Sequence, residues 1–270
     1  MIPDSGPAAP IGVFDSGVGG LTVVAALRRR LPAESILYLG DTARLPYGSK
    51  SRDTVVGYTR KNVRFLLDRG VKAVVIACNT ASALALDDLE PTVPTWGVIE
   101  PGARAAAAVS RGRVGVIATE STVRSGAYPR ALARLRPELA VTSQACPLFV
   151  PLVEEGWHDD PVTAEVAARY LAPLLAAEVD TLVLGCTHYP LLKTVLARAA
   201  PGVALVDSAE TVAELVAAGL AEAGLAVPVP SRETVLKHHL CVTDAGLTFE
   251  RIAARILGDP GLPLEWVEIL

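Results

Sequence analysis

The chain has 270 residues, 51% of them hydrophobic and 20% charged, so it can bury a substantial core in one or two domains. A formal net charge of −4 with scattered basic residues excludes the basic face that nucleic-acid binding needs. Four cysteines are too few for a disulfide scaffold, and neither a signal peptide nor a bilayer-spanning apolar run is evident. We therefore expect a protein of the reducing cytoplasm, with free thiols and no membrane partner.

The first seventy residues alternate short apolar runs with amphipathic segments. A strand over residues 11–14 meets the polar, glycine-rich segment 15–20, and a helical pattern then covers about 21–30. A second strand is expected over 35–39, ending at Gly40-Asp41. A turn at 45–48 precedes an amphipathic helix over about 51–69. The spacing of strands and helices predicts units in which a helix connects two parallel strands.

The same alternation continues through the middle of the chain. Strands are expected over 73–77, over 93–101 between prolines, and over 114–118. Helices are expected from about Ala81 and from about Gly102. This order favours an α/β fold in which mostly parallel sheets are flanked by helices.

Two pairs of segments suggest that the chain repeats itself. Residues 11–16 parallel 114–119, and the segment around Cys78 parallels the one around Cys186, at similar separations. A duplicated α/β unit explains both pairs. The alternative is chance, because strings of apolar and small residues before a cysteine are common in such folds.

Four chemically capable residues follow predicted strands: Asp15, Cys78, Thr119 and Cys186. Open α/β sheets bind ligands at the carboxyl ends of their strands. If the two halves face each other, these residues line one cleft between them. Two thiols on opposite sides of a cleft could move a proton from one face of a carbon atom to the other.

Cys78 and Cys186 each precede polar residues and a helix-like segment. A helix N-terminus can lower the pKa of a thiol, and only the thiolate reacts, so we interpret both as reactive. The alternative for any free cysteine is a buried small hydrophobic residue. We assign that role to Cys146 and Cys241.

Further polar residues could assist these thiols. His188 lies two residues after Cys186 and could hold a proton near it, although a structural histidine is the alternative. Of the paired Glu154 and Glu155, one could point into the cleft, although such pairs usually form a solvated helix face.

Two other polar motifs are weaker evidence for a functional site. The glycines of 17–20 could present backbone N–H groups to a carboxylate, or only form a tight turn. We reject His238, His239 and Cys241 as a metal site, because strand alternation separates the histidines and no fourth ligand is evident.

Together these motifs resemble the glutamate racemases, cofactor-independent enzymes that supply D-glutamate for peptidoglycan. The matching segments are 11–22, 40–42 with 46–48, 77–82, 97–102, 115–119 and 184–191. The resemblance implies two pseudo-symmetric α/β domains with the active site in the cleft between them. It implies a discontinuous first domain (1–101 plus 207–270), a second domain (102–206), a homodimer, and no cofactor or metal. Leu45 occupies a position that varies in the family.

The resemblance also implies roles for particular residues. Cys78 and Cys186 would be the catalytic thiols, with Asp15 assisting near the first, and His188 and Glu154 near the second. L-glutamate and D-glutamate would be the substrates. Their contacts would come from Asp15, Ser16, Tyr47, Gly48, Asn79, Thr80, Thr119, Thr187 and His188.

Three other functions fit parts of the sequence. A related racemase could act on aspartate or a hydantoin. A binding protein could keep the fold without catalysis, although both thiols are present. A thiol-redox protein is disfavoured because the sequence has no CxxC pair.

Overall fold

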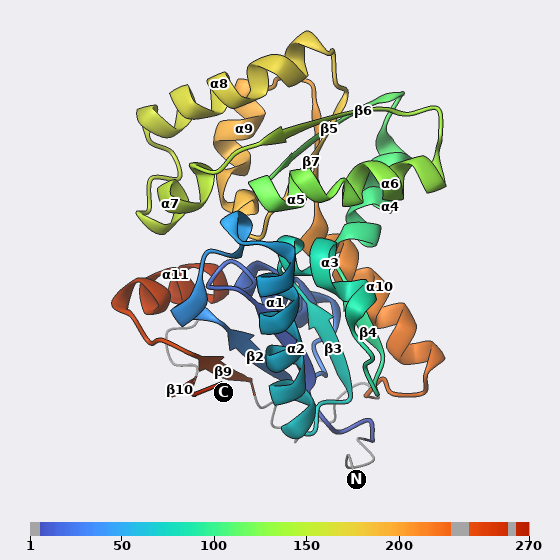
Figure 1. The fold of residues 1–270 in the computed structure, drawn as a ribbon, viewed down its shortest axis with the longest axis vertical. Helices are drawn as coiled ribbons and strands as arrows, with labels where there is room; N and C mark the ends of the chain where they lie inside the picture. The colour runs from blue at the N-terminus through green and yellow to red at the C-terminus, as the bar shows by residue number, and fades with distance from the viewer. Residues whose placement is uncertain (1–5, 228–237, 259–262, 270) are drawn as a thin grey trace.

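The computed structural model describes residues 6–227, 238–258 and 263–269, and its strands form two separate sheets (Figure 1). Every strand pair in both sheets is parallel. The α/β architecture predicted from the sequence is therefore confirmed, with two sheets in two domains flanked by helices. Over the described ranges, no helix is long and apolar enough to cross a membrane.

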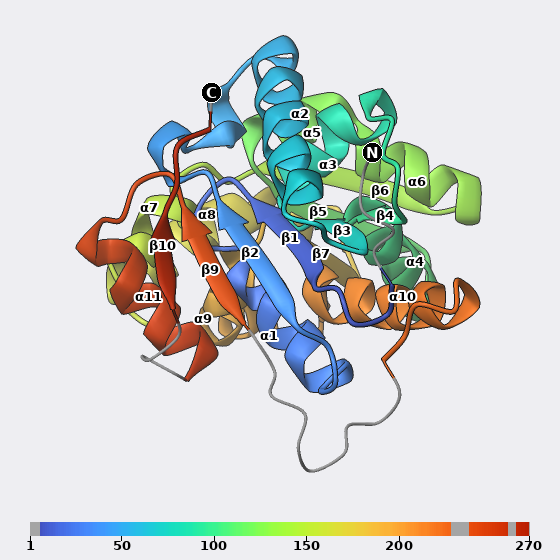
Figure 2. The same cartoon turned by 90° about the horizontal axis from the view of Figure 1, so that it is seen from below.

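The first sheet has the strand order β10-β9-β2-β1-β3-β4. Its strands are β1 (Ile11–Asp15), β2 (Ile36–Gly40), β3 (Ala73–Ile76), β4 (Thr95–Gly97), β9 (His239–Val242) and β10 (Leu264–Trp266). Figure 2 shows helices α1 (Leu21–Arg30), α10 (Ser208–Glu222) and α11 (Leu247–Leu257) on one face of this sheet. Helices α2 (Arg52–Asp68) and α3 (Asn79–Ala85) cover the other face.

The second sheet is contiguous in the sequence and has the order β6-β5-β7-β8. Its strands are β5 (Arg113–Ala118), β6 (Ala140–Ala145), β7 (Thr181–Gly185) and β8 (Ala204–Asp207). One core cluster involves α7 (Phe149–Glu154), α8 (Pro161–Ala176) and α9 (Lys193–Ala199). The other involves α4 (Ile99–Val109) and α6 (Ala127–Leu135), while the short α5 (Glu120–Ser125) follows β5.

Burial on both faces explains why the sequences of the strands are continuous apolar runs. β1, β2, β3 and β7 are buried along their whole length, as expected for parallel strands with helices on both faces. The helices are amphipathic. In α2, for example, Ser51 caps the first turn by accepting from the Thr54 amide, and apolar residues from Val55 to Leu67 face the sheet.

Two predicted helix starts are wrong by two or three residues. α3 begins at Asn79 instead of Ala81, because Cys78 already takes the N-cap position. α4 begins at Ile99 instead of Gly102. Pro101 lies in its first turn, where the missing amide hydrogen costs nothing, so the proline does not delimit the helix as expected.

The chain enters the second sheet through α4 and returns to the first through α10, and these two helices pack against each other. The domain boundaries expected from the resemblance fall inside α4 and β8. They remain a prediction, and residues 1–5, 228–237, 259–262 and 270 of the proposed first domain lie outside the described residues.

Candidate active site

A pocket lies where the carboxyl ends of the two sheets meet. The first domain contributes residues that follow β1, β2 and β3, and the second contributes residues that follow β5 and β7, together with α7. Its lining residues are Ser16, Gly17, Leu45, Pro46, Tyr47, Gly48, Cys78, Asn79, Thr80, Thr119, Val150, Glu154, Cys186, Thr187 and His188. All the sequence-predicted site residues therefore line one pocket, except Asp15.

Cys78 stands between β3 and α3 and is 5% exposed. Its Sγ donates to Ser16 Oγ over 3.5 Å. Burial, reinforced by the negative charge of Asp15, raises the pKa of the Cys78 thiol to about 12. The expectation that the helix start lowers this pKa is wrong, because the hydrogen bonds with Ser16 and the backbone do not offset the effect of burial.

Cys186 follows β7 on the opposite side of the pocket and is 7% exposed. The segment after it is a short 3₁₀ turn (Tyr189–Leu192), and α9 begins only at Lys193. The settings of the two thiols therefore differ more than the sequence repeat suggests. The polar partner of Cys186 is a side chain, since its Sγ lies 3.9 Å from His188 Nδ1.

His188 connects Cys186 with Glu154. Its Nε2 lies 3.1 Å from Glu154 Oε1, so one imidazole contacts a thiol and a carboxylate through its two nitrogens. Burial lowers the pKa of His188, but the hydrogen bonds and negative charges of Cys186 and Glu154 outweigh it and raise the pKa to about 10. The ring is therefore an imidazolium at neutral pH.

The structure distinguishes the two glutamates that the sequence left open. Glu154 lines the pocket and bonds to His188, whereas Glu155 is exposed. Glu154 is also held from the first domain, because Arg251 Nη2 on α11 donates to its backbone carbonyl over 2.8 Å. Of the pair, Glu154 is the residue that faces the site.

Asp15 lies behind the pocket wall and is fully buried. Its carboxylate accepts from the Gly17 amide over 2.9 Å and from Thr187 Oγ1 over 3.3 Å. Burial raises the pKa of Asp15, although the charge of His188 and these hydrogen bonds act in the opposite direction. Asp15 thus connects the glycine loop of the first domain to Thr187 of the second.

Close packing explains one glycine of that loop. A Cβ on Gly19 would lie 2.4 Å from Thr187 Oγ1 and 2.5 Å from His188 Nδ1. Only a residue without a side chain lets the loop approach the second domain this closely.

Hydroxyl groups join the domains on the other side of the pocket. Thr80 Oγ1 lies 2.9 Å from Thr119 Oγ1 and 3.1 Å from Thr122 Oγ1. The neighbouring Asn79 accepts from Tyr128 Oη over 2.7 Å, while its Nδ2 is buried and has no partner among the described residues. A buried amide donor at the pocket is available to an anionic ligand.

Sequence reasoning missed Tyr128 and assigned no role to Asp41. Tyr128 lies on α6 and no motif marks it. Asp41 could have been noticed, because it stands at the carboxyl end of β2, as Asp15 does at the end of β1 and Cys78 beyond the end of β3.

The cysteines outside the pocket are fully buried. Cys146 belongs to a core cluster of the second domain and Cys241 to one of the first. His239, Cys241 and Glu265 come close together, so the rejected metal site gains a carboxylate that the sequence did not suggest. Arg69 donates to both oxygens of Glu265, over 2.8 and 3.2 Å. This ion pair explains the position of the Glu265 carboxylate without a metal ion.

Residues 12–216 match the model of the Asp/Glu/Hydantoin racemase family. The chain belongs to this family. It is 53% identical to the glutamate racemase of Geobacter metallireducens, over 93% of this chain and 94% of the relative. The glutamate racemase of Thermus thermophilus is 55% identical over 82% of this chain and 84% of its own.

Solved structures of the family share the whole fold. A glutamate racemase from Bacillus anthracis has a TM-score of 0.91 at 40% identity, covering 97% of this chain and 98% of that one. A glutamate racemase from Francisella tularensis, solved in complex with D-glutamate, has the same TM-score at 37% identity and the same coverage. An aspartate racemase from Picrophilus torridus shares the fold at 18% identity with a TM-score of 0.56. The chain is thus an amino-acid racemase and belongs to the isomerases.

Proposed function

We propose that the chain interconverts L-glutamate and D-glutamate without a cofactor, using Cys78 and Cys186 as its two acid–base groups. The observation that carries the proposal is that these two thiols come from different sheets and line one pocket. The proposal gains support from relatives of about 50% identity that are glutamate racemases, and from a structural neighbour that binds D-glutamate.

The reaction needs one thiolate and one thiol. With L-glutamate, the Cys186 thiolate takes the α-proton, and the Cys78 thiol donates its own proton to the other face of the carbanion. The product is D-glutamate, and the enzyme is left with a Cys186 thiol and a Cys78 thiolate, ready for the reverse reaction. A pKa of about 12 keeps Cys78 protonated at neutral pH, which is the form that L-glutamate requires.

His188 and Asp15 assist the two thiols. The His188 ring lies beside Cys186 and can hold a proton near its sulfur, while Glu154 holds the ring in place. Asp15 acts from behind Cys78, where its charge favours the protonated thiol. A further role for Asp15 is to hold Thr187 at the pocket wall.

The carbanion needs stabilisation through the substrate carboxylate, since no electron sink is proposed. Asn79 Nδ2 is the clearest donor, because it is buried at the pocket without a partner among the described residues. Hydrogen bonds in a site shielded from water strengthen as charge develops. The remaining substrate contacts are assigned to Ser16, Tyr47, Gly48, Thr80, Thr119, Thr187 and His188.

The proposal extends to the use of the product, the cellular compartment and the oligomeric state. D-glutamate made by this reaction would serve peptidoglycan synthesis, and the reducing cytoplasm would keep the thiols free. The active species would be a homodimer without nucleic-acid or membrane partners. A solution mass equal to the 28.2 kDa of one chain would contradict the dimer.

The test is to incubate the purified protein with L-glutamate in D2O, with chelator and without pyridoxal, following optical rotation and the α-proton signal. We expect rotation to decay to zero while deuterium enters the α-position. Exchange without inversion would contradict the two-thiol mechanism. Faster racemisation of aspartate, assayed alongside, would overturn the substrate assignment.

Substitution of the thiols completes the test. Cys78→Ala and Cys186→Ala should each lower the racemisation rate by about 10²–10⁴-fold or more, because a general acid or base usually contributes that much. Cys146→Ala is the matched control, because that thiol is equally buried but lies outside the pocket. Full activity in either pocket variant would contradict the mechanism.

A further inference from the structure

We propose that Asp41 is a positioning residue for glutamate binding, which holds the wall formed by Leu45, Pro46, Tyr47 and Gly48 at the width the substrate needs. The inference rests on the proposed function for its ligand, and it concerns a residue that does not line the pocket. Asp41 follows β2 and is fully buried, and its amide donates to the Asp15 carbonyl over 3.0 Å.

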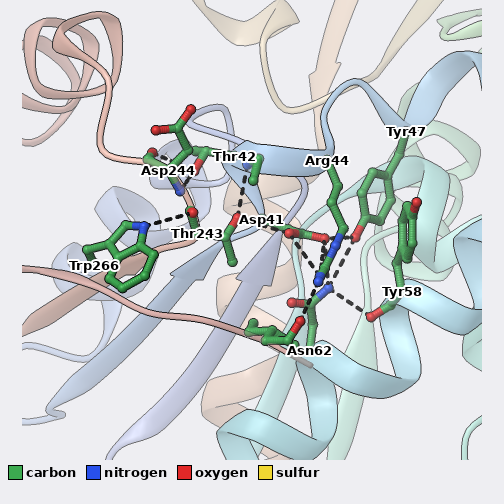
Figure 3. Close-up of polar contacts among 11 residues, drawn as sticks. Asp41, Thr42, Arg44, Tyr47, Tyr58, Asn62, Thr243, Asp244 and Trp266 are labelled. Carbon is green, nitrogen blue, oxygen red and sulfur yellow. Dashed lines mark hydrogen bonds and ion pairs between the residues drawn. The ribbon is translucent and has the colours of Figure 1, made fainter.

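The Asp41 carboxylate accepts hydrogen bonds from four side chains, two that follow it closely in the sequence and two from other elements (Figure 3). Tyr47 Oη donates over 2.5 Å, Thr243 Oγ1 over 3.0 Å and Asn62 Nδ2 over 3.2 Å. Arg44 Nη1 lies 3.3 Å away and forms an ion pair. Arg44 and Tyr47 belong to two short 3₁₀ turns after β2 (Thr42–Arg44 and Tyr47–Ser49). Asn62 lies on α2, and Thr243 directly follows β9.

This network fixes the Tyr47 ring. A buried carboxylate is costly to leave without donors, so its partners are held in one arrangement. The Tyr47 hydroxyl also accepts from Asn62, and the ring packs against Phe14 and Tyr58 with centroids 6.1 and 5.7 Å apart. The residue is 1% exposed and lines the pocket.

Arg44 extends the network to the end of the chain. Its guanidinium donates to the Ile269 carbonyl and lies 5.2 Å from the centre of the Tyr58 ring. Ile269 is buried in the same core cluster as Tyr47. The pocket wall is therefore also held by residues that do not line the pocket.

The wall has little freedom on its other side. A Cβ on Gly48 would lie 2.6 Å from the Cβ of Thr119, and Ser121 Oγ donates to the Lys50 carbonyl over 3.0 Å. Both contacts join the two domains. A shift of the Tyr47–Gly48 segment would therefore change the distance between the two domains at the pocket. Neither Cys78 nor Cys186 would have to be substituted for this to happen.

The test compares Asp41→Asn with Glu34→Gln. Glu34 is a matched control, because its carboxylate is 2% exposed and paired with Lys72, but it precedes β2 and so lies at the opposite end of the strand. For each variant we would measure glutamate affinity by calorimetry, KM and kcat for racemisation, and thermal stability. Tyr47→Phe, which keeps the ring, would be measured in the same way.

Asp41→Asn should weaken glutamate binding and raise KM by about 10–100-fold, the worth of a hydrogen bond to a charged group, and change kcat less than KM. Tyr47→Phe should weaken binding by about 2–10-fold. Glu34→Gln should lower thermal stability while leaving affinity and KM unchanged. Equal effects of Asp41→Asn and Glu34→Gln on KM, or unchanged affinity in Asp41→Asn, would overturn the inference.

Calorimetry separates this inference from the proposed function. A wild-type protein that binds glutamate without racemising it would contradict the proposed reaction, while the affinity comparison would still decide the role of Asp41. A wild-type protein that binds no glutamate would contradict both.

Discussion

Adjacent glutamates at the end of α7 have different surroundings, because Glu154 contacts His188 and Glu155 faces solvent. Glu154→Gln keeps the shape but removes the charge that stabilises the imidazolium. We expect kcat/KM to fall by about 10–100-fold, since a hydrogen bond to a charged group contributes about 1.5–3 kcal/mol.

Steady-state racemisation of glutamate checks this expectation. Glu155→Gln removes the same charge one residue further on, so it controls for net charge and should leave kcat/KM unchanged. Equal losses in the two variants would show that His188 does not depend on Glu154.

The Cys78 thiol gives a pH dependence with a definite sign. Its pKa is raised to about 12, so the neutral thiol is favoured in the folded protein. An ordinary thiol ionises near pH 8.5, so the unfolded chain loses this proton first. Cys78 should therefore reduce stability as pH rises from about 9 towards 12, and contribute no pH dependence below that range.

Thiolate absorbance in the ultraviolet measures this ionisation directly. The difference between wild type and Cys78→Ala should stay near zero up to about pH 10. A difference that appears with an apparent pKa at or below about 8.5 would contradict the raised pKa. Such a result would restore the sequence-based expectation of an activated thiol.

Helix α2 carries a glycine that packing does not require. Gly57 is exposed in the helix interior, and a Cβ there would meet no atom within 4 Å. Gly57→Ala should raise the free energy of unfolding by about 0.5–1 kcal/mol, because alanine loses less backbone entropy on folding.

Chemical denaturation measures the change, and activity should not alter. Gly19→Ala is the opposite case, since its Cβ would collide with Thr187 and His188. A gain in stability for Gly19→Ala would contradict the close approach described for that loop.

Most elements could be predicted from the sequence because their signals are local. β1 and α1 match the expected ranges closely, since an apolar run, a glycine turn and an amphipathic stretch each depend on neighbouring residues. The start of α3 could not be predicted as well. Whether Cys78 or a later residue caps that helix depends on how the strand before it is held.

At the scale of the whole molecule, the sequence predicted which residues gather at the pocket but not how they are held there. Cys78 and Cys186 could be placed together because each follows a strand, and two α/β halves that face each other bring the carboxyl ends of their strands to one cleft. The contacts of Asp41 with Thr243, and of Arg44 with Ile269, join residues about two hundred positions apart. No periodicity or motif reports such contacts.

The pKa of Cys78 could not be predicted for a related reason. A helix start is visible in the sequence, whereas burial and the nearby charge of Asp15 are properties of the folded site. The domains likewise approach each other through Gly19 and Gly48, whose need for a missing side chain becomes evident only with both domains in place.

The late position of β9 in the chain has a consequence for synthesis on the ribosome. β2 pairs with β1 on one side and with β9 on the other. Residues 239–242 are translated after the whole second sheet, so a nascent chain carries β2 with one row of backbone groups unpaired. An open strand edge invites pairing with other chains. Translation that stalls before residue 239 would therefore release a product with a complete second domain and an aggregation-prone first one.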